Sequence, residues 1–377
     1  GAESLAATLA GFAVAYLMRP LGALFFGHIG DRFGRRRTML LSVALMTAAM
    51  LAIALLPTRA TVGPVAGWLL LALRCVMGFA VGGEFTGVVA YLMEGAAARR
   101  RGLVTSLAAA ASEVGGLLAV GIAALTVGAM SAASLDAWGW RIPFFVGAAL
   151  AGSVAIARSA MAESPHFEQQ QAAGTVPRHP LRHALATQRR GIARGFAISA
   201  LGSITYYVGI TYVPAFLTTA GAMSEAGSLG LSTIAAVAVI AVTPLVGLAS
   251  DRWGRRPVLI AFGLLAALLP ITMFGWMASG SAAAALAGAV VLAGVAGGVS
   301  AVGAVATAEQ LGGEGRLTGL ALGATSATAI FGGLTPWAAH WLTAASGWPA
   351  VPGLMIAIVA LAVLPLLARM PETRPGG

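Results

Sequence analysis

The sequence predicts an all-α integral membrane protein, built from two helical bundles that are related by an internal repeat. Hydrophobic residues make up 58% of the 377 residues and charged residues only 10%, whereas a soluble domain carries about 25% charged residues. The apolar residues fall into long runs, and one charged motif occurs twice, at widely separated positions. With a mean hydropathy of +0.87, the chain has too few polar residues for a water-facing surface, so lipid is its expected solvent.

Eleven apolar runs are long enough to cross a bilayer core of about 30 Å, which takes about 20 helical residues. Two uncharged stretches, 257–308 and 317–368, are each too long for one span and are expected to be helical hairpins, broken at 279–281 and 346–349. The predicted spans are 5–30, 38–57, 64–92, 103–130, 141–160, 192–219, 226–249, 257–278, 283–308, 317–343 and 348–368.

The arginines set the predicted orientation. No lysine occurs, and most of the 23 arginines lie in one alternate set of loops, while the other set holds only Arg59 and Arg141. Cytoplasmic loops carry the excess of positive charge. The chain is therefore expected to be a multi-pass protein of the cell (inner) membrane with a cytoplasmic C-terminus. Because the arginines stand between apolar runs, the net charge of +10 indicates contact with a lipid bilayer and not with nucleic acid.

A polar segment, 161–191, interrupts the regular succession of spans. It holds three prolines, a run of glutamines and most of the histidines. It is expected to be a cytoplasmic linker between an N-terminal bundle, 1–160, and a C-terminal bundle, 192–377.

The two halves repeat the same charged motifs. The pattern G-x-x-x-D-R-x-G-R-R stands at 27–36 and again at 247–256. Each half also places a glutamate seven residues before an arginine: Glu94 and Arg101, and Glu309 and Arg316. Parallel repeats about an axis normal to the membrane are a transporter architecture, with the solute site near the midplane between the repeats.

The repeated motif resembles the signature loop of the major facilitator superfamily. Further stretches resemble the metabolite:proton symporters of the organic acid and betaine type: 19–37, 82–84 (G-G-E), 138–144 (W-G-W-R-I-P-F) and 163–167 (E-S-P-H-F). The resemblance covers nearly the whole chain and implies a two-bundle transporter with a pseudo-twofold repeat. It also implies twelve spans, of which this chain shows eleven and lacks the first.

Arginines inside the spans are candidate substrate-binding residues, because a charge near the bilayer centre costs about 3 kcal/mol or more. Arg74 resembles the superfamily's buried fourth-helix arginine and is expected to bind an anionic group, with a structural ion pair as the alternative. Arg19, next to Pro20, is expected to line the cavity or to satisfy the carbonyl that the proline frees. Because guanidinium binds carboxylate bidentately, two such arginines favour an organic acid or a zwitterion over a neutral sugar.

Two intramembrane glutamates, Glu84 and Glu113, are candidate proton carriers, because a carboxyl group removed from water can take up and release a proton near neutral pH. The alternative for Glu84 is an ion pair with an arginine, and for Glu113 a place near the cytoplasmic end of its helix. Tyr206 and Tyr207, in the first helix of the second half, are expected to face the solute or to pack as an aromatic stripe.

The repeated loops are expected to hold the cytoplasmic face shut in one state. Asp31 and Asp251 can accept hydrogen bonds from a helix N-terminus of the opposite half or pair with a nearby arginine. Breaking and remaking such contacts permits alternating access. The candidate gating residues are Asp31, Arg35, Arg36, Glu94, Arg101, Asp251, Arg255, Glu309 and Arg316.

Other kinds of chemistry have no good motif. The five histidines are scattered and Cys75 lies in an apolar run, so no metal site is expected. No phosphate-binding P-loop and no nucleophile arrangement occurs, which argues against ATP as the driving force and against an enzyme. The expected function is proton-coupled symport of a small organic acid or zwitterion by a monomer, driven by the proton gradient without a cofactor. The alternatives are a sugar-porter-type uniporter or symporter, because 163–165 and 371–373 also resemble sugar-porter motifs, a truncated inactive transporter, and a membrane sensor.

Overall fold

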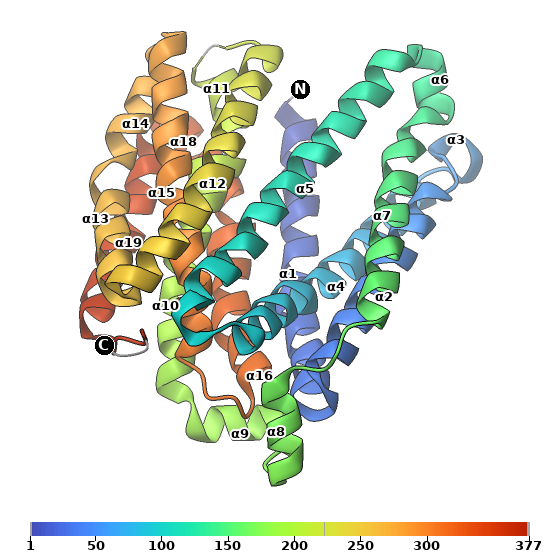
Figure 1. Cartoon of the computed structure of the whole chain (residues 1–377). Helices are drawn as coiled ribbons and strands as arrows, with labels where there is room; N and C mark the ends of the chain where they lie inside the picture. Colours follow the sequence, from blue (N-terminus) through green and yellow to red (C-terminus); the bar gives the residue numbers. More distant parts are fainter. Residues whose placement is uncertain (1, 222, 375–377) are drawn as a thin grey trace.

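Two helical bundles stand side by side in the computed structural model, joined at one end and separated at the other (Figure 1). The structure describes residues 2–221 and 223–374, apart from the side chains of residues 2–10 and 12. The N-terminal bundle contains α1 (Ala2–Phe33), α2 (Arg35–Ala54), α3 (Arg59–Val62), α4 (Val65–Gly95), α5 (Arg101–Ala129), α6 (Ala132–Ala137) and α7 (Ile142–Ser159). Two short helices, α8 (Pro165–Ala173) and α9 (Pro180–Thr187), connect it to the second bundle at the joined end.

The C-terminal bundle contains more broken helices than the first. Its helices are α10 (Arg189–Tyr206), α11 (Val213–Thr219), α12 (Glu225–Trp253), α13 (Arg255–Leu268), α14 (Pro270–Met277), α15 (Ala282–Glu309), α16 (Arg316–Leu320), α17 (Ser326–Thr328), α18 (Thr335–Ser346) and α19 (Val351–Arg369). Three π-helical turns interrupt this bundle: η3 (Tyr207–Thr211), η4 (Ala321–Thr325) and η5 (Ala329–Gly333). Such turns widen a helix locally and occur frequently at functional sites.

The described helices account for the predicted spans. Eight of them are long and apolar enough to cross a membrane, and the number is ten if each of two bent pairs counts as one span. The first bent pair joins α10 to α11 at 42°, and the second joins α13 to α14 at 45°, where Pro270 follows the bend. Helix α1 has 32 residues and is about 48 Å long, so with it the count is compatible with the eleven predicted spans.

The repeated motif forms the same sharp turn in both bundles. Gly34 separates α1 from α2 with a φ of 108°, and Gly254 separates α12 from α13 with a φ of 104°. A side chain would be strained at these φ values, and a Cβ would also collide with the carboxylate of Glu163 at the first turn and of Glu372 at the second. The motif therefore requires glycine at this position for two physical reasons.

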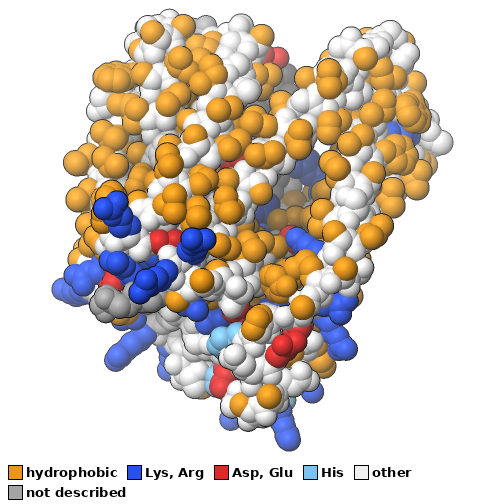
Figure 2. All heavy atoms as spheres, viewed as in Figure 1, with side chains coloured by type: hydrophobic (Ala, Val, Ile, Leu, Met, Phe, Trp, Pro, Cys, Tyr) orange, Lys and Arg blue, Asp and Glu red, His pale blue; other side chains and the backbone are white. Residues whose placement is uncertain are grey.

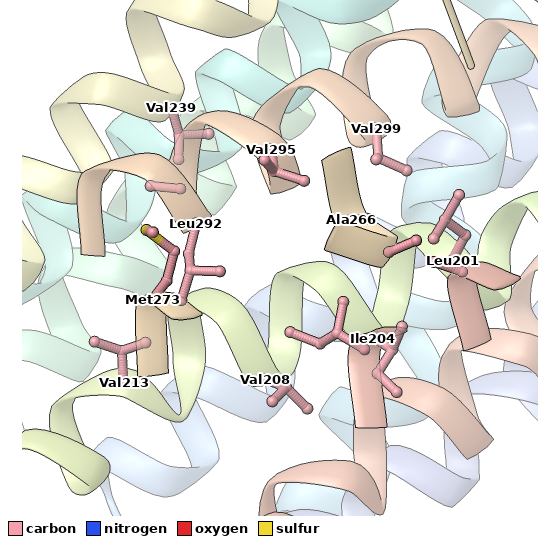
Figure 3. Packing of buried hydrophobic residues seen from close by; sticks show 14 of the residues in the cluster. Leu201, Ile204, Val208, Val213, Val239, Ala266, Met273, Leu292, Val295 and Val299 are labelled. Carbon is pink, nitrogen blue, oxygen red and sulfur yellow. The ribbon is translucent and has the colours of Figure 1, made fainter. Parts of the chain in front are cut away.

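The largest apolar core lies in the C-terminal bundle. Helix α15 crosses its centre and is mostly buried, with residues such as Leu292, Val295 and Val299 packed against Leu201 and Ile204 of α10 (Figure 3). Charged side chains gather at the joined end of the molecule, around α8 and α9, while hydrophobic side chains cover the flanks of both bundles (Figure 2). We call this end the arginine-rich end.

Candidate functional site

A cavity of about 340 Å³ lies between the two bundles. Helices α1, α4 and α5 form one wall, and α10, α12, α15 and the π-interrupted segment from α16 to α17 form the other. Most of the polar lining side chains are hydroxyl groups of serine, threonine and tyrosine. Arg19 and Glu113 are the charged residues among those that line it. The cavity is therefore a mainly neutral space with one positive and one negative group.

Arg19 faces this cavity from the middle of α1, directly before Pro20. Its guanidinium carbon lies 3.7 Å from the centre of the Tyr16 ring, a cation–π contact. Its Nε is buried and has no hydrogen-bond partner among the described residues. Arg19 thus retains hydrogen-bonding capacity for an anionic group in the cavity.

Three tyrosines join Arg19 and Glu113 across the cavity. The hydroxyls of Tyr16 and Tyr207 share a hydrogen bond between the two bundles, and the Tyr206 hydroxyl donates to Oε1 of Glu113. The Tyr207 ring lies 5.3 Å from the Tyr16 ring and 5.2 Å from the Tyr206 ring. A change at either charged group can therefore reach the other through contacts between the bundles.

An apolar layer separates the cavity from the arginine-rich end. Its buried residues come from α4 on one side and from α15, α16 and the loop between them on the other: Val89, Ala90, Met93, Val305, Ala308, Leu311, Leu317 and Leu320. Val89 and Leu320 also line the cavity. The layer closes the space between the bundles on this side.

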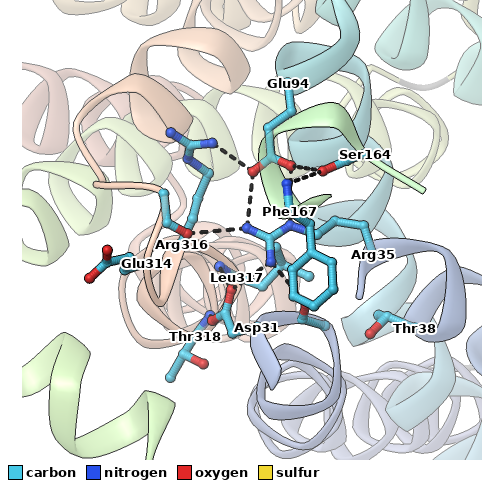
Figure 4. A network of polar contacts seen from close by, with 12 residues as sticks. Asp31, Arg35, Thr38, Glu94, Ser164, Phe167, Glu314, Arg316, Leu317 and Thr318 are labelled. Atoms are coloured by element: carbon cyan, nitrogen blue, oxygen red, sulfur yellow. Dashed lines mark hydrogen bonds and ion pairs between the residues drawn. The ribbon is translucent and has the colours of Figure 1, made fainter. Parts of the chain in front are cut away.

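A buried network of charges lies beyond the apolar layer (Figure 4). Asp31 of α1 accepts hydrogen bonds from the backbone N–H groups of Leu317 (3.2 Å) and Thr318 (2.8 Å), at the N-terminus of α16. Glu94 accepts from Nη2 of Arg35 (3.0 Å) and from Nη1 of Arg316 (2.6 Å). We call Asp31, Arg35, Glu94 and Arg316 the first charged cluster.

The first charged cluster is supported from the linker and from the opposite loop. The Ser164 hydroxyl, at the start of α8, donates to Glu94 (2.6 Å), and Nη2 of Arg35 donates to the Gly313 carbonyl (3.1 Å). Glu163 accepts from the backbone N–H groups of Arg35 (2.8 Å) and Arg36 (3.2 Å) and so caps the start of α2. The cluster thereby ties both bundles and the linker together.

The second occurrence of the motif builds a similar network, the second charged cluster: Asp251, Arg255, Glu309 and Arg101. Asp251 of α12 accepts from the backbone N–H groups of Gly102 (2.8 Å) and Leu103 (2.9 Å), at the N-terminus of α5. Glu309 accepts from Nε (3.1 Å) and Nη2 (3.2 Å) of Arg255.

Glu372 caps the start of α13 in the second charged cluster, as Glu163 caps α2 in the first. It accepts from the backbone N–H groups of Arg255 (2.8 Å) and Arg256 (3.0 Å). The Thr373 hydroxyl donates to Glu309 (2.6 Å), in the place that Ser164 has at Glu94. The two networks therefore share a bonding pattern down to the capping carboxylate and the neighbouring hydroxyl.

Comparison with known proteins gives the same assignment for both halves of the chain. Residues 2–177 match the family model "Sugar (and other) transporter", and residues 222–377 match "Major Facilitator Superfamily". The proline/betaine transporter of Salmonella typhimurium is 30% identical over 376 residues, which cover 97% of this chain and 75% of the relative. The chain belongs to the major facilitator superfamily. It is a membrane transporter and not an enzyme, and its place among the metabolite:proton symporters, predicted from its motifs, is confirmed.

Further relatives and a solved structure agree with this membership. The alpha-ketoglutarate permease of Escherichia coli is 33% identical over 331 residues, covering 87% of this chain and 75% of the relative. The citrate-proton symporter of Klebsiella pneumoniae is 30% identical over 364 residues, covering 95% and 80%. The structure of the proton:xylose symporter XylE aligns with a TM-score of 0.81 at 22% identity, covering 99% of this chain and 88% of that one, which shows the shared fold.

Two predicted residues lie away from the cavity. Glu84 of α4 forms an ion pair with Arg158 of α7 (2.5 Å) and accepts a hydrogen bond from Ser42 of α2 (2.6 Å). The alternative role for Glu84, an ion pair with an arginine inside its own bundle, is therefore the arrangement in the structure. Arg74 is half-buried in α4 and is not among the residues that line the cavity.

The pairing of the gating residues differs from the sequence prediction. The sequence pairs Glu94 with Arg101 and Glu309 with Arg316. In the structure, Glu94 binds Arg35 and Arg316, and Glu309 binds Arg255. The prediction was wrong because helices α4 and α15 carry their glutamates toward the turn of the repeated motif, where the guanidinium of the motif arginine is fully buried.

Tyr16 is the cavity residue that sequence reasoning missed. It is 5% exposed, and it lies three residues before Arg19, which places both side chains on one face of α1. That spacing is the signal that could have found it. Arg158 was also missed, because a single arginine at a helix end looks like a topology signal until its partner is known.

Two groups outside the spans have shifted pKa values. Burial lowers the pKa of His166 below its usual value, and the positive charge of Arg316 lowers it further. Burial alone would raise the pKa of Glu372, but hydrogen bonds from the backbone N–H groups of Arg255, Arg374, Arg256 and Thr373 outweigh it and leave that pKa below the usual range. The carboxylate form of Glu372 is therefore the form that caps α13.

Proposed function

We propose that this chain is a proton-coupled symporter of a small organic acid or zwitterion, working by alternating access in the cell (inner) membrane. The observation that carries the proposal is the pair of opposite charges, Arg19 and Glu113, in the cavity between the bundles. A guanidinium binds carboxylate strongly, and an intramembrane carboxyl group is a typical element of a proton relay. The names of the relatives, which include proline/betaine, alpha-ketoglutarate and citrate–proton carriers, support this solute class.

The arginine-rich end faces the cytoplasm in this proposal, and the C-terminus lies there too, because positive residues remain on the cytoplasmic side of the membrane. The apolar layer and the two charged clusters then close the cavity toward the cytoplasm, so the conformation is one that receives solute from outside. A single chain supplies both walls of the cavity, so the monomer in its lipid bilayer is the transporting unit.

In the proposed cycle, Arg19 binds the anionic group of the solute, and Tyr206 and Tyr207 complete the wall beside it. Glu113 takes up the proton. Its ionised carboxylate accepts the Tyr206 hydroxyl, and protonation weakens this bond, which couples proton uptake to the tyrosines that join the bundles. The bundles, 1–160 and 192–377, then rock against each other and the charged clusters open. Glu84 is less suited to carry the proton, because Arg158 already neutralises it.

A neutral sugar is the second candidate solute, favoured by the many hydroxyl groups of the cavity and by the fold shared with a xylose symporter. Uptake of labelled solutes into proteoliposomes under an imposed pH gradient separates the two. We expect accumulation of proline, glycine betaine, alpha-ketoglutarate or citrate that collapses with a protonophore. Uptake of xylose alone, indifferent to the gradient, would contradict the proposal.

Replacing Arg19 by glutamine tests the solute site directly. We expect Arg19→Gln to reduce uptake at least tenfold, through loss of one charge-assisted contact worth about 1.5–3 kcal/mol. Arg74→Gln is the matched control, because it removes the same charge from the same bundle outside the cavity. Equal losses in the two variants at equal protein content would show that Arg19 has no special role in solute binding.

A further inference from the structure

A second cavity, of about 960 Å³, lies at the arginine-rich end and shares no lining residue with the cavity between the bundles. It is enclosed by α8, α9, the N-terminus of α10 and the loop 310–314 that connects α15 to α16. No step of the proposed transport cycle uses it. Its lining contains the amide side chains of Gln170, Gln188 and Gln310.

Buried polar atoms without partners face this cavity. Gln170 is only 5% exposed, yet neither its Oε1 nor its Nε2 has a hydrogen-bond partner among the described residues. Nε2 of Gln310, Oε1 of Gln188 and Nδ1 of His166 are likewise buried and unpartnered there. Buried polar groups are normally satisfied, so several unsatisfied groups around one cavity indicate that a polar ligand occupies it.

The charge around the cavity is positive. Three arginines of α10, Arg189, Arg190 and Arg194, line it, against one carboxylate, Glu314, which lies 3.7 Å from His183. Helix α10 also begins here. Its N-cap residue, Gln188, makes no side-chain capping bond, so the first backbone N–H groups and the positive end of the helix dipole are directed to this side. Anions bind at such helix ends.

We propose that this cavity binds a phosphate-type oxyanion at the N-terminus of α10. Arg190 and Arg194 supply its positive charge, and the amide groups of Gln170 and Gln310 donate hydrogen bonds from the opposite side. A phosphate group, with several oxygens directed in different directions, fits donors on three elements better than a planar carboxylate does. The group can belong to a soluble phosphorylated compound or to the headgroup of an anionic phospholipid.

Occupancy of this site stabilises the closed conformation. The carbonyl of Gly313 accepts from Arg35 of the first charged cluster, and the loop 310–314 also forms one wall of the cavity. An anion that holds this loop against α8 and α10 therefore keeps the Arg35 contact in place. The site is independent of which solute the chain carries.

Thermal unfolding of the purified chain with added inorganic phosphate tests the proposal. We expect phosphate, compared with chloride at equal ionic strength, to raise the Tm in a saturable way. Gln170→Leu and Arg190→Gln should each weaken the apparent affinity about tenfold, as expected for the loss of one anion contact. Arg369→Gln, an exposed arginine at the same end of the molecule but outside the cavity, is the matched control and should leave the affinity unchanged.

Nanodiscs separate the two sources of the phosphate group. Stabilisation by inorganic phosphate that is the same in phosphatidylcholine and phosphatidylglycerol discs assigns the site to a soluble ligand. Stabilisation by phosphatidylglycerol that Gln170→Leu and Arg190→Gln abolish assigns it to a lipid headgroup. Absence of any effect of phosphate and of phosphatidylglycerol overturns the proposal, and so does an effect that Arg369→Gln reduces as much as the two cavity variants do.

Discussion

The two charged clusters have the same local structure but different contacts between the bundles. In each, an aspartate accepts two backbone N–H groups from a helix of the opposite bundle, and a buried arginine joins it to a glutamate. The first charged cluster adds an ion pair between Arg316 and Glu94 and a hydrogen bond from Arg35 to Gly313, both between bundles. In the second, Glu309 pairs within its own bundle, and Nε of Arg101 is buried without a partner among the described residues.

This difference separates what the repeated motif encodes from what it does not. The motif fixes the turn, the buried arginine and the aspartate that reaches across, because these depend on residues close together in the chain. The extra contacts depend on the loop that stands opposite, and the two loops differ. We infer that the first charged cluster contributes more than the second to closing the arginine-rich end.

Replacing Glu94 is expected to have the largest effect on this closure. Glu94→Gln leaves two buried guanidinium groups, Arg35 and Arg316, without a counter-charge, and breaking a buried ion pair costs about 3–5 kcal/mol. A cysteine introduced at Thr325, in the cavity, should then react with a reagent applied from the cytoplasmic side of inverted vesicles.

Glu309→Gln is the matched variant in the second charged cluster. Arg255 still pairs with Asp251 (2.8 Å), and no ion pair between the bundles is lost among the described contacts, so labelling from the cytoplasmic side should remain near the wild-type level. Equal opening by the two variants would contradict the inferred difference between the clusters.

The aspartates should show a smaller and nearly equal effect. Asp31→Asn and Asp251→Asn each weaken two hydrogen bonds from backbone N–H groups, and bonds to a charged acceptor are worth about 1.5–3 kcal/mol each. Uptake rates of the two variants, corrected for protein content, should therefore lie within about threefold of each other. A much larger loss for one of them would place the difference between the clusters at the aspartates and not at the Arg316–Glu94 pair.

The smallest effect concerns the capping carboxylate of the second charged cluster. The pKa of Glu372 is lower in the folded chain than in the unfolded chain, so its stabilising contribution is complete above the unfolded pKa and is lost as the pH falls through the folded value. The Tm of Glu372→Gln should lie below that of the wild type at pH 7, and the gap should close as the pH approaches 3. A gap that stays constant over this range would show that the charge of Glu372 does not matter.

The sequence predicts the membrane class, the repeat and the turn of each motif well, because these follow from hydropathy, arginine distribution and glycine geometry. It also finds Asp31, Asp251, Arg19 and Glu113, since a charge in a span or a repeated acid stands out. It cannot predict the partner of Glu84, because the ion pair with Arg158 joins residues far apart in the chain. The same limit applies to the π-helical turn at Tyr207, which no local pattern marks and which helps to bring the tyrosine to the cavity.

The most direct test of the transport site compares accumulation with exchange in Glu113→Gln. The account predicts that this variant loses uptake against a concentration gradient driven by a pH difference, but retains exchange of labelled for unlabelled solute at equal pH on both sides. Exchange needs the solute site at Arg19 and the movement of the bundles, but no net proton movement. Accumulation driven by the pH difference at the wild-type level in Glu113→Gln would contradict the assignment of the proton to Glu113.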